Sequence, residues 1–136
     1  MSFDLSWLLE KRIVYAHAYG QVTVNDLQVI VDTIADDIRH GEPPVYAIVD
    51  LTSVDKFPTR INAYKDFIFP PEEPNTGKLL LISANKVALF IISVIAQLSQ
   101  RCIYTFPTLD AGLSFLARTD TSLPWFDLVT EQAAPV

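Results

Sequence analysis

The sequence predicts a single α/β domain in which an N-terminal β-hairpin is followed by alternating strands and helices, with a mostly parallel sheet and about four helices. Short apolar runs typical of buried strands alternate along the chain with segments in which apolar residues recur at helical spacing. Helices placed between strands are typical of the crossover connections that join parallel strands. The 136 residues suffice for one core, and we expect the domain at residues 1–118. Residues 119–136 lack periodicity and are expected to form an irregular tail, which Trp125 and Phe126 can anchor.

Five segments of the chain have the pattern of strands. The first two are joined by the charged turn Glu10-Lys11-Arg12 and are expected to form the hairpin. The other three are short apolar runs, which are typical of strands buried on both faces of a sheet. In chain order, the strands are expected at residues 5–9, 13–22, 45–51, 78–83 and 102–106.

Four segments have helical patterns. The first is the most regular, because Thr23 can cap its start, Asp26 follows three residues later and Gly41 ends it. The second is short and is stopped by Pro70-Pro71, and the last is capped by Thr108. The four helices are expected from residue 24 to the stop at residue 41, and at residues 59–69, 85–100 and 108–117.

The composition argues against several classes of protein. Mean hydropathy is high at +0.27, but no apolar run reaches the roughly 18 residues that a membrane span requires. A net charge of −6 disfavours nucleic acid as a partner, because its phosphates bind clustered Lys and Arg. The single Cys102, expected to be buried, excludes an intrachain disulfide, and with only two histidines it excludes the common zinc patterns. The N-terminus does not resemble a secretion signal. We therefore expect a cytoplasmic protein with no metal, cofactor or transmembrane segment.

The stretch VYAIVDLTSVDKFPTRIN, at residues 45–62, carries a resemblance to a known family. Its strand ends in Asp-Leu-Thr-Ser-Val, and this ending, with the order of the elements, resembles the STAS domains, in which a strand ends in Asp-Leu-Ser-x-Val. The closing segment FPTLDAGLSFL, at residues 106–116, is more similar to the SpoIIAA-like subgroup, which also resembles the lipid-binding CRAL-TRIO fold. The resemblance covers residues 5–117 and implies a regulatory or protein-interaction module.

The family's phosphorylation switch has one equivalent position in this chain. In the anti-sigma-factor antagonists, a kinase phosphorylates the serine of an Asp-Ser pair that begins the helix after the Asp-Leu-Ser-x-Val strand. Thr59 takes the place of that serine, but Pro58 replaces the aspartate, and Arg60 is also foreign to the pattern. Thr59 is therefore either a phosphorylation site, as the resemblance implies, or the N-cap of its helix, which is the interpretation we adopt.

Asp50, Thr52 and Ser53 form a candidate site at the end of a strand. Asp50 lies at the carboxyl end of a parallel strand, the edge at which open sheets bind ligands. The alternative is structural, with Asp50 accepting hydrogen bonds from the amides of loop residues 52–55. His17, in the strand segment YAHAY, has no evident acid or nucleophile beside it. Since no catalytic constellation is found, we expect that the protein is not an enzyme.

The helix expected at residues 85–100 is apolar around most of its circumference and must bury more than one face. It is either packed deeply between neighbouring helices, or it forms a homodimer interface, the wall of an apolar pocket or a contact with a membrane surface. Aromatic side chains in the preceding segment can form the opposing wall or a lid. The candidate interface or pocket residues are Phe57, Tyr64, Phe67, Phe69, Leu89, Phe90, Ile91, Ile92 and Ile95.

Two functions follow from these patterns. The first is a non-enzymatic STAS-like regulatory or protein-interaction module that acts as a homodimer. The alternative is a carrier or sensor of a lipid or other apolar small molecule, with peripheral membrane contact as an option. A closed apolar cavity beside the long helix favours the carrier, whereas a flat apolar face repeated by two-fold symmetry favours the interaction module.

Overall fold

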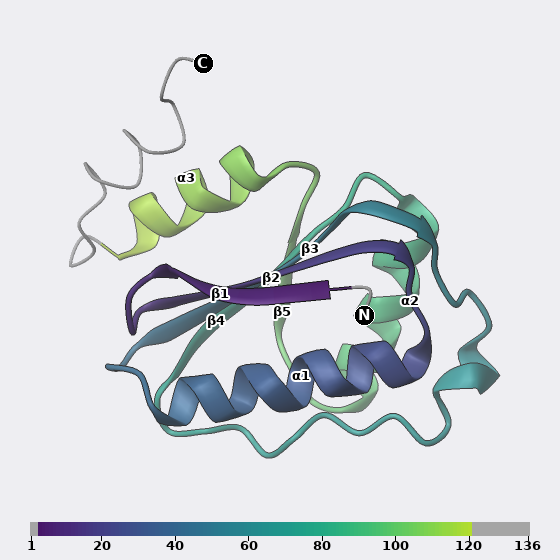
Figure 1. Ribbon diagram of the computed structural model, residues 1–136, viewed down its shortest axis with the longest axis horizontal. Coiled ribbons are helices and arrows are strands. Elements are labelled where there is room, and N and C mark those ends of the chain that lie inside the picture. Colours follow the sequence, from purple (N-terminus) through teal and green to yellow (C-terminus); the bar gives the residue numbers. More distant parts are fainter. Residues whose placement is uncertain (1–2, 121–136) are drawn as a thin grey trace.

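The computed structural model describes residues 3–120, which form one sheet with helices on both faces (Figure 1). The strands follow one another across the sheet in chain order, from β1 to β5. The strands are β1 (Phe3–Leu9), β2 (Ile13–Gln21), β3 (Val45–Lys56), β4 (Thr76–Ile82) and β5 (Ile103–Phe106). The helices are α1 (Val24–Arg39), α2 (Lys86–Leu98) and α3 (Leu109–Thr119), and a short 3-10 helix, η1, spans Ile61–Tyr64.

The sheet is mixed, which corrects the expectation of a mostly parallel sheet. Strand β1 pairs with β2 in antiparallel orientation, whereas β2 with β3, β3 with β4 and β4 with β5 are parallel pairs. The cause is the hairpin, because the short turn after β1 can only return the chain antiparallel to that strand. Lys11 adopts the left-handed conformation in this turn, with φ at 64°.

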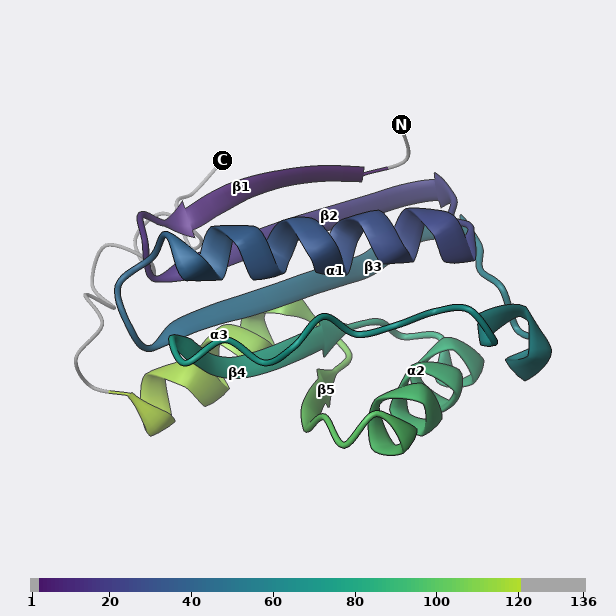
Figure 2. The same ribbon diagram turned by 90° about the horizontal axis from the view of Figure 1, so that it is seen from below.

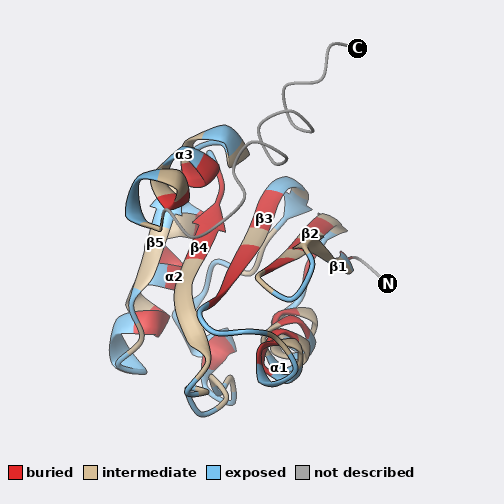
Figure 3. Cartoon of the chain, turned by 90° about the vertical axis from the view of Figure 1, so that its left-hand side faces the viewer, coloured by how far each residue is buried: buried red, intermediate tan, exposed pale blue. Residues whose placement is uncertain are grey.

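The molecule has three layers, with α1 and α2 on one face of the sheet and α3 on the other (Figure 2). Side chains alternate along β3, so that Val45 and Ala47 face α1 and α2, whereas Tyr46 and Ile48 face α3. Burial is deepest in the middle strands and on the helix faces that touch them (Figure 3). The sheet therefore separates two apolar cores.

The expected start of α1 is confirmed. The Thr23 hydroxyl accepts a hydrogen bond from the Asp26 amide at 3.1 Å, and the Asp26 carboxylate accepts one from the Thr23 amide at 3.0 Å. This reciprocal capping box satisfies two backbone groups that a helix start leaves without partners. The cap expected at Thr108 is confirmed as well, since its hydroxyl accepts from the Ala111 amide.

The helix expected at residues 59–69 is wrong, so the described chain has three α-helices instead of four. Only η1 forms in this segment; it begins after Arg60 and its N-cap has no side-chain hydrogen bond. The N-cap role expected of Thr59 is therefore also wrong. The physical reason is visible at Phe67, Ile68 and Phe69: the two phenylalanines pack against the core while Ile68, 69% exposed, faces outward. This alternation has the period of an extended chain.

The last helix extends two residues beyond the expected end, to Thr119. Asp120 then pairs with Arg12 at 3.3 Å and accepts a hydrogen bond from the Tyr46 hydroxyl. Burial, together with this hydrogen bond, raises the pKa of Tyr46 to about 12. Trp125 and Phe126 lie outside the described residues.

The end of α2 fixes the chain for the following turn. Gln100 adopts the left-handed conformation, with φ at 57°, and the Arg101 amide donates to the Ala96 carbonyl at 2.8 Å. This arrangement is a Schellman motif, in which the left-handed position is usually glycine. It reverses the chain and directs Arg101 back toward the sheet.

Replacing Gln100 with glycine should stabilise the protein slightly. Relief of the left-handed strain is worth roughly 1 to 2 kcal/mol, and the greater freedom of glycine in the unfolded chain offsets about 0.5 to 1 kcal/mol of it. We expect Gln100→Gly to raise the free energy of unfolding by about 0.5 kcal/mol in urea titrations. Gln97→Gly, within α2, is the matched control and should lower it by about 0.5 to 1 kcal/mol. Equal destabilisation by both changes would contradict the assigned C-terminal motif.

Candidate functional site

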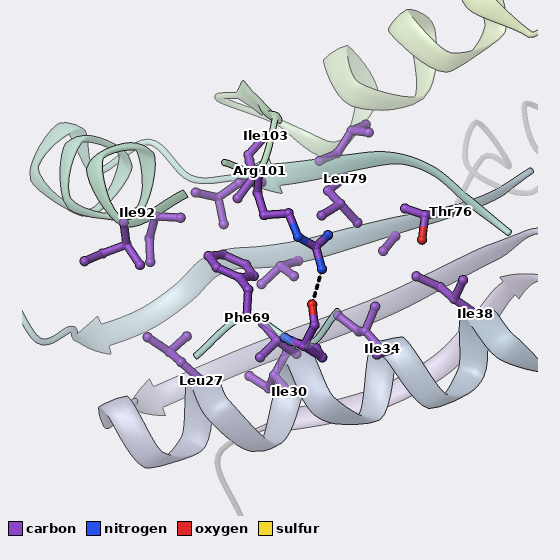
Figure 4. Close-up of a pocket in the computed structure, with 18 of the residues that line it drawn as sticks. Leu27, Ile30, Ile34, Ile38, Phe69, Thr76, Leu79, Ile92, Arg101 and Ile103 are labelled. Carbon is purple, nitrogen blue, oxygen red and sulfur yellow. Dashed lines mark hydrogen bonds between the residues drawn. The ribbon is translucent and has the colours of Figure 1, made fainter. Parts of the chain in front are cut away.

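An apolar cavity of about 80 Å³, partly open to solvent, lies between α1, α2 and the sheet (Figure 4). Its walls come from elements that are distant in sequence but adjacent in the fold. On α1 and α2 they are Leu27, Ile30, Ile34, Ala35, Ile38, Ile92 and Ile95, and on the sheet they are Ala47, Val49, Leu79, Leu81 and Ile103. The cavity thus arises where the two helices diverge and the sheet floor is left without a helix directly above it.

Residues 67–71, which we call the strap, cover part of this cavity. Phe67 and Phe69 line it, with ring centroids 5.2 Å apart in an edge-to-face arrangement. The side chain of Gln28 on α1 clamps the outward-facing Ile68: its amide oxygen accepts from the Ile68 amide at 2.9 Å, and its nitrogen donates to the Ile68 carbonyl at 2.7 Å. The strap therefore takes backbone hydrogen bonds from a side chain where a strand would take them from a neighbouring strand.

Arg101 holds the other side of the strap. Figure 4 shows its side chain reaching from the turn before β5 toward α1. The guanidinium donates a hydrogen bond to the Pro70 carbonyl and lies 5.6 Å from the centre of the Phe69 ring. Near this end, Arg39 of α1 pairs at 3.3 Å with Glu73, another residue of the cavity wall. The lining is thus almost entirely apolar apart from Arg101, Thr76 and Glu73, and Glu73 is paired with Arg39.

A second, more open hollow lies on the outer side of the strap. Its volume is about 430 Å³, and Ser99, Gln100 and Glu72 contribute polar groups to it. The strap and Arg101 line both spaces. They form the partition between an apolar interior and an open, polar exterior.

The structure brings only part of the predicted aromatic and apolar set to the cavity. Phe67, Phe69, Ile92 and Ile95 line it. The others lie elsewhere: Phe57, Tyr64, Leu89 and Ile91 belong to the same core without lining the cavity, and Phe90 is 63% exposed. The Tyr64 hydroxyl donates to the Pro58 carbonyl at 2.8 Å, and burial raises the pKa of this phenol.

Sequence reasoning missed Gln28 and Arg101. Gln28 lies among the polar residues of α1, and this pattern predicts a helix face exposed to solvent. Arg101 carried a weak signal, since it is a lone charge between an apolar helix and a strand. Their partners are 40 and 31 residues away, so neither contact leaves a local pattern.

The candidate strand-end residues lie on the α3 side of the sheet, away from the cavity. The buried Asp50 carboxylate accepts hydrogen bonds from the Tyr15 hydroxyl, from the Thr52 amide at 2.9 Å and from the Thr52 hydroxyl at 2.6 Å. These bonds tie the end of β3 to itself and to β2. Desolvation and the neighbouring carboxylate raise the pKa of Tyr15, which keeps its phenol protonated as the donor.

Two expectations near this edge are corrected. His17 does lie beside a nucleophile, because β2 and β3 pair in parallel and bring its Nε2 to 3.0 Å from the Ser53 hydroxyl oxygen. Within residues 3–120, no acid contacts the other ring nitrogen, and Asp50 is engaged by Tyr15 and Thr52, so the pair lacks the third group of a triad. Cys102 is exposed instead of buried, since β5 begins only at Ile103.

Two further features are absent from residues 3–120. No group of three or more His, Cys, Asp or Glu side chains is arranged to hold a metal ion. No helix in this range has the length and apolar character needed to cross a membrane.

Comparison with known proteins identifies the fold. No family model matches the chain, and no curated protein matches it. Among solved structures, it is similar to an uncharacterised protein of the DUF3478 family from Shewanella loihica PV-4, described as having a SpoIIAA-like fold, with a TM-score of 0.51. The match covers 84% of this chain and 91% of that one. The fold of this chain is SpoIIAA-like. At 12% identity, the similarity to that SpoIIAA-like protein establishes the fold alone.

Removing the clamp on Ile68 should loosen the strap without unfolding the protein. Gln28→Leu deletes both hydrogen bonds while keeping a side chain of similar length, and a net loss of about 1 kcal/mol is expected because the freed groups are hydrated. Hydrogen exchange at the Ile68 amide should accelerate about fivefold, and exchange in β3 should stay unchanged. Gln97→Leu, on the exposed side of α2, is the control. Unchanged exchange at Ile68 would show that the clamp does not hold the strap.

Proposed function

We propose that this SpoIIAA-like protein is a non-enzymatic module that carries or senses an apolar small molecule in the cavity between α1 and α2. The observation that carries the proposal is the apolar cavity beside α2, which is partly open to solvent and which a simple interaction module does not need. Such cavities are the default binding sites of proteins when a few polar groups converge on them, as Arg101 and Glu73 do here.

The energetic cost of the cavity supports a functional reason for keeping it. Protein interiors are close-packed, and few voids exceed the size of a water molecule. The space of about 80 Å³ leaves apolar side chains of α1, α2 and the sheet without packing partners, and this lost contact disfavours the folded state. A larger side chain on the sheet floor, where Ala47 stands, would remove that cost.

The construction of the strap supports entry and release. A dry cavity of about 150 Å³ holds benzene, so a space of about 80 Å³ does not hold a lipid chain unless a wall moves. The strap is the wall least tied to the sheet, since the side chains of Gln28 and Arg101 hold its middle and the Phe67 amide bonds only locally, to the Tyr64 carbonyl. Movement of the strap joins the inner cavity to the outer hollow. It also changes the surface beside α2, which provides a physical link between ligand binding and a regulatory role.

Filling the cavity should abolish binding while keeping the fold. Ala35 on α1 lines the cavity, and Ala35→Leu places three more carbon atoms in it. Val29→Leu, on the exposed side of the same helix, is the matched control. With fatty acids, fatty alcohols and phospholipids as probes, we expect wild type and Val29→Leu to gain melting temperature and amide protection across residues 57–71. Ala35→Leu should gain neither.

Two outcomes would contradict the carrier. One is that no lipid of the panel changes melting temperature or exchange in the wild-type protein. The other is that Ala35→Leu responds as strongly as Val29→Leu, which would place the ligand outside the cavity.

A second candidate, a homodimeric interaction module, is favoured by the outer face of α2. Val87, Phe90 and Leu98 are 53%, 63% and 75% exposed and lie on one side of this helix. Ile91 and Ile92, which we expected to include an interface residue, are both buried in the domain's own core. Any interface on α2 is therefore centred on Phe90. A second copy of the chain, meeting this stripe by two-fold symmetry, would bury it.

Phe90→Asp tests this candidate, because a carboxylate desolvated at an interface is strongly unfavourable. We expect the wild-type protein to sediment as a dimer at micromolar concentration and the variant as a folded monomer. Val29→Asp introduces the same charge at a partly exposed apolar site on α1 and should leave the dimer intact. A monomeric wild-type protein would end the homodimer proposal without affecting the carrier.

A further inference from the structure

We infer that the ligand of the cavity is a single-chain amphiphile with an anionic head group, a carboxylate or a phosphate, and that Arg101 binds this head. The inference rests on the proposed carrier function and names the chemical class of its ligand. Arg101 is the cationic residue shared by the inner cavity and the outer hollow.

Within residues 3–120, the contacts of Arg101 include no counter-ion for its charge. A guanidinium carries five N–H donors and stays protonated in proteins. Within residues 3–120, the hydrogen bond of this group goes to the Pro70 carbonyl, and its other recorded partner is the Phe69 ring. No carboxylate of this range lies within 4.0 Å of it, whereas Arg12 and Arg39 are both ion-paired. A partly buried charge is costly without a counter-ion, and an anionic ligand supplies one.

The other charges around the cavity leave Arg101 as the attraction for an anion. Glu73 is the acidic residue of the wall, and Arg39 pairs with it at 3.3 Å and neutralises it. The chain as a whole carries a net charge of −6, so its long-range field repels anions. Selection of an anionic head must therefore be local, through contact with the guanidinium.

The position of Arg101 at the partition selects an amphiphile. On its inner side the lining is aliphatic and aromatic, which suits a hydrocarbon chain. On its outer side the hollow is open and polar, which suits a hydrated head. A ligand that crosses the partition places its charge at Arg101 and its chain over the sheet. The narrow interior favours one chain over two.

Binding of the head also explains how the strap is released. An incoming carboxylate or phosphate competes with the Pro70 carbonyl for the same guanidinium donors. A bidentate pair with a carboxylate or phosphate adds the attraction between opposite charges, which the neutral Pro70 carbonyl does not supply, so we expect the anion to displace Pro70. This exchange frees one of the two side-chain ties of the strap and leaves the Gln28 clamp as the remaining hinge. A neutral head cannot make the exchange.

The test compares three probes with the same chain length, decanoic acid, decyl phosphate and 1-decanol, at pH 8 and below their micelle concentrations. Calorimetry should show that the wild-type protein binds at least one of the two anions roughly tenfold or more tightly than the alcohol. Arg101→Gln should remove that preference and leave the affinity for 1-decanol within about threefold of wild type. Arg101→Lys, which keeps a charge without the planar fork, should retain part of it. Arg118→Gln, at an exposed position on α3, should match wild type.

The outcomes separate this inference from the proposed function. Equal affinity for the alcohol and the anions in wild type, or an anion preference that survives in Arg101→Gln, would overturn the role of Arg101 and leave the carrier standing. Binding of none of the three probes would overturn both. The stronger of the two anions identifies the head group as carboxylate or phosphate. Melting curves and hydrogen exchange in β3 establish whether Arg101→Gln is folded. If Arg101→Gln does not fold, the preference for anions over 1-decanol is measured in Arg101→Lys instead.

Discussion

The central constraint on this structure is that β3 and β4 are buried on both faces, so that their side chains alternate between two separate cores. A helix must cover each face, and the connections place α1 and α2 on one side and α3 on the other. On this face, α1 and α2 diverge from each other (Figure 2). The floor between them is covered by the strap instead, and the cavity forms beneath it.

The strap therefore covers the core and is also the segment whose movement is proposed to admit a ligand to the cavity. Its two phenylalanines shield the sheet floor, yet its backbone is held by the side chains of Gln28 and Arg101. Side-chain ties can be exchanged for contacts with a ligand one at a time, whereas a strand must break a ladder. The sheet under the cavity is therefore expected to open rarely, whereas the strap is expected to open more readily.

The polar groups on the other face have a different character. Asp50 serves Tyr15 and Thr52 within the sheet, and His17 meets Ser53 across two parallel strands. These contacts hold the ends of β2 and β3 in register, and the ring of Tyr15 stacks beside His17 while that of Tyr19 lies tilted to it. The distribution of chemistry between the faces is thus unequal. One side has an apolar cavity lined by Arg101, which has no ion-pair partner among residues 3–120, and the other side has a hydrogen-bonded strand edge.

The sequence by itself determined the elements whose residues signal locally. The helical period of α1, the caps at Thr23 and Thr108 and the apolar runs of the strands were all predicted, because periodicity and capping depend on neighbours a few residues apart. Only the tertiary structure decided what lies between α1 and α2. Phe67 and Phe69 form an extended strap because the sheet and helices offer walls to fill. Gln28 and Arg101 become its ties because chain segments 40 and 31 residues apart meet there. Such pairings depend on which elements become neighbours, and a single sequence carries no local record of that.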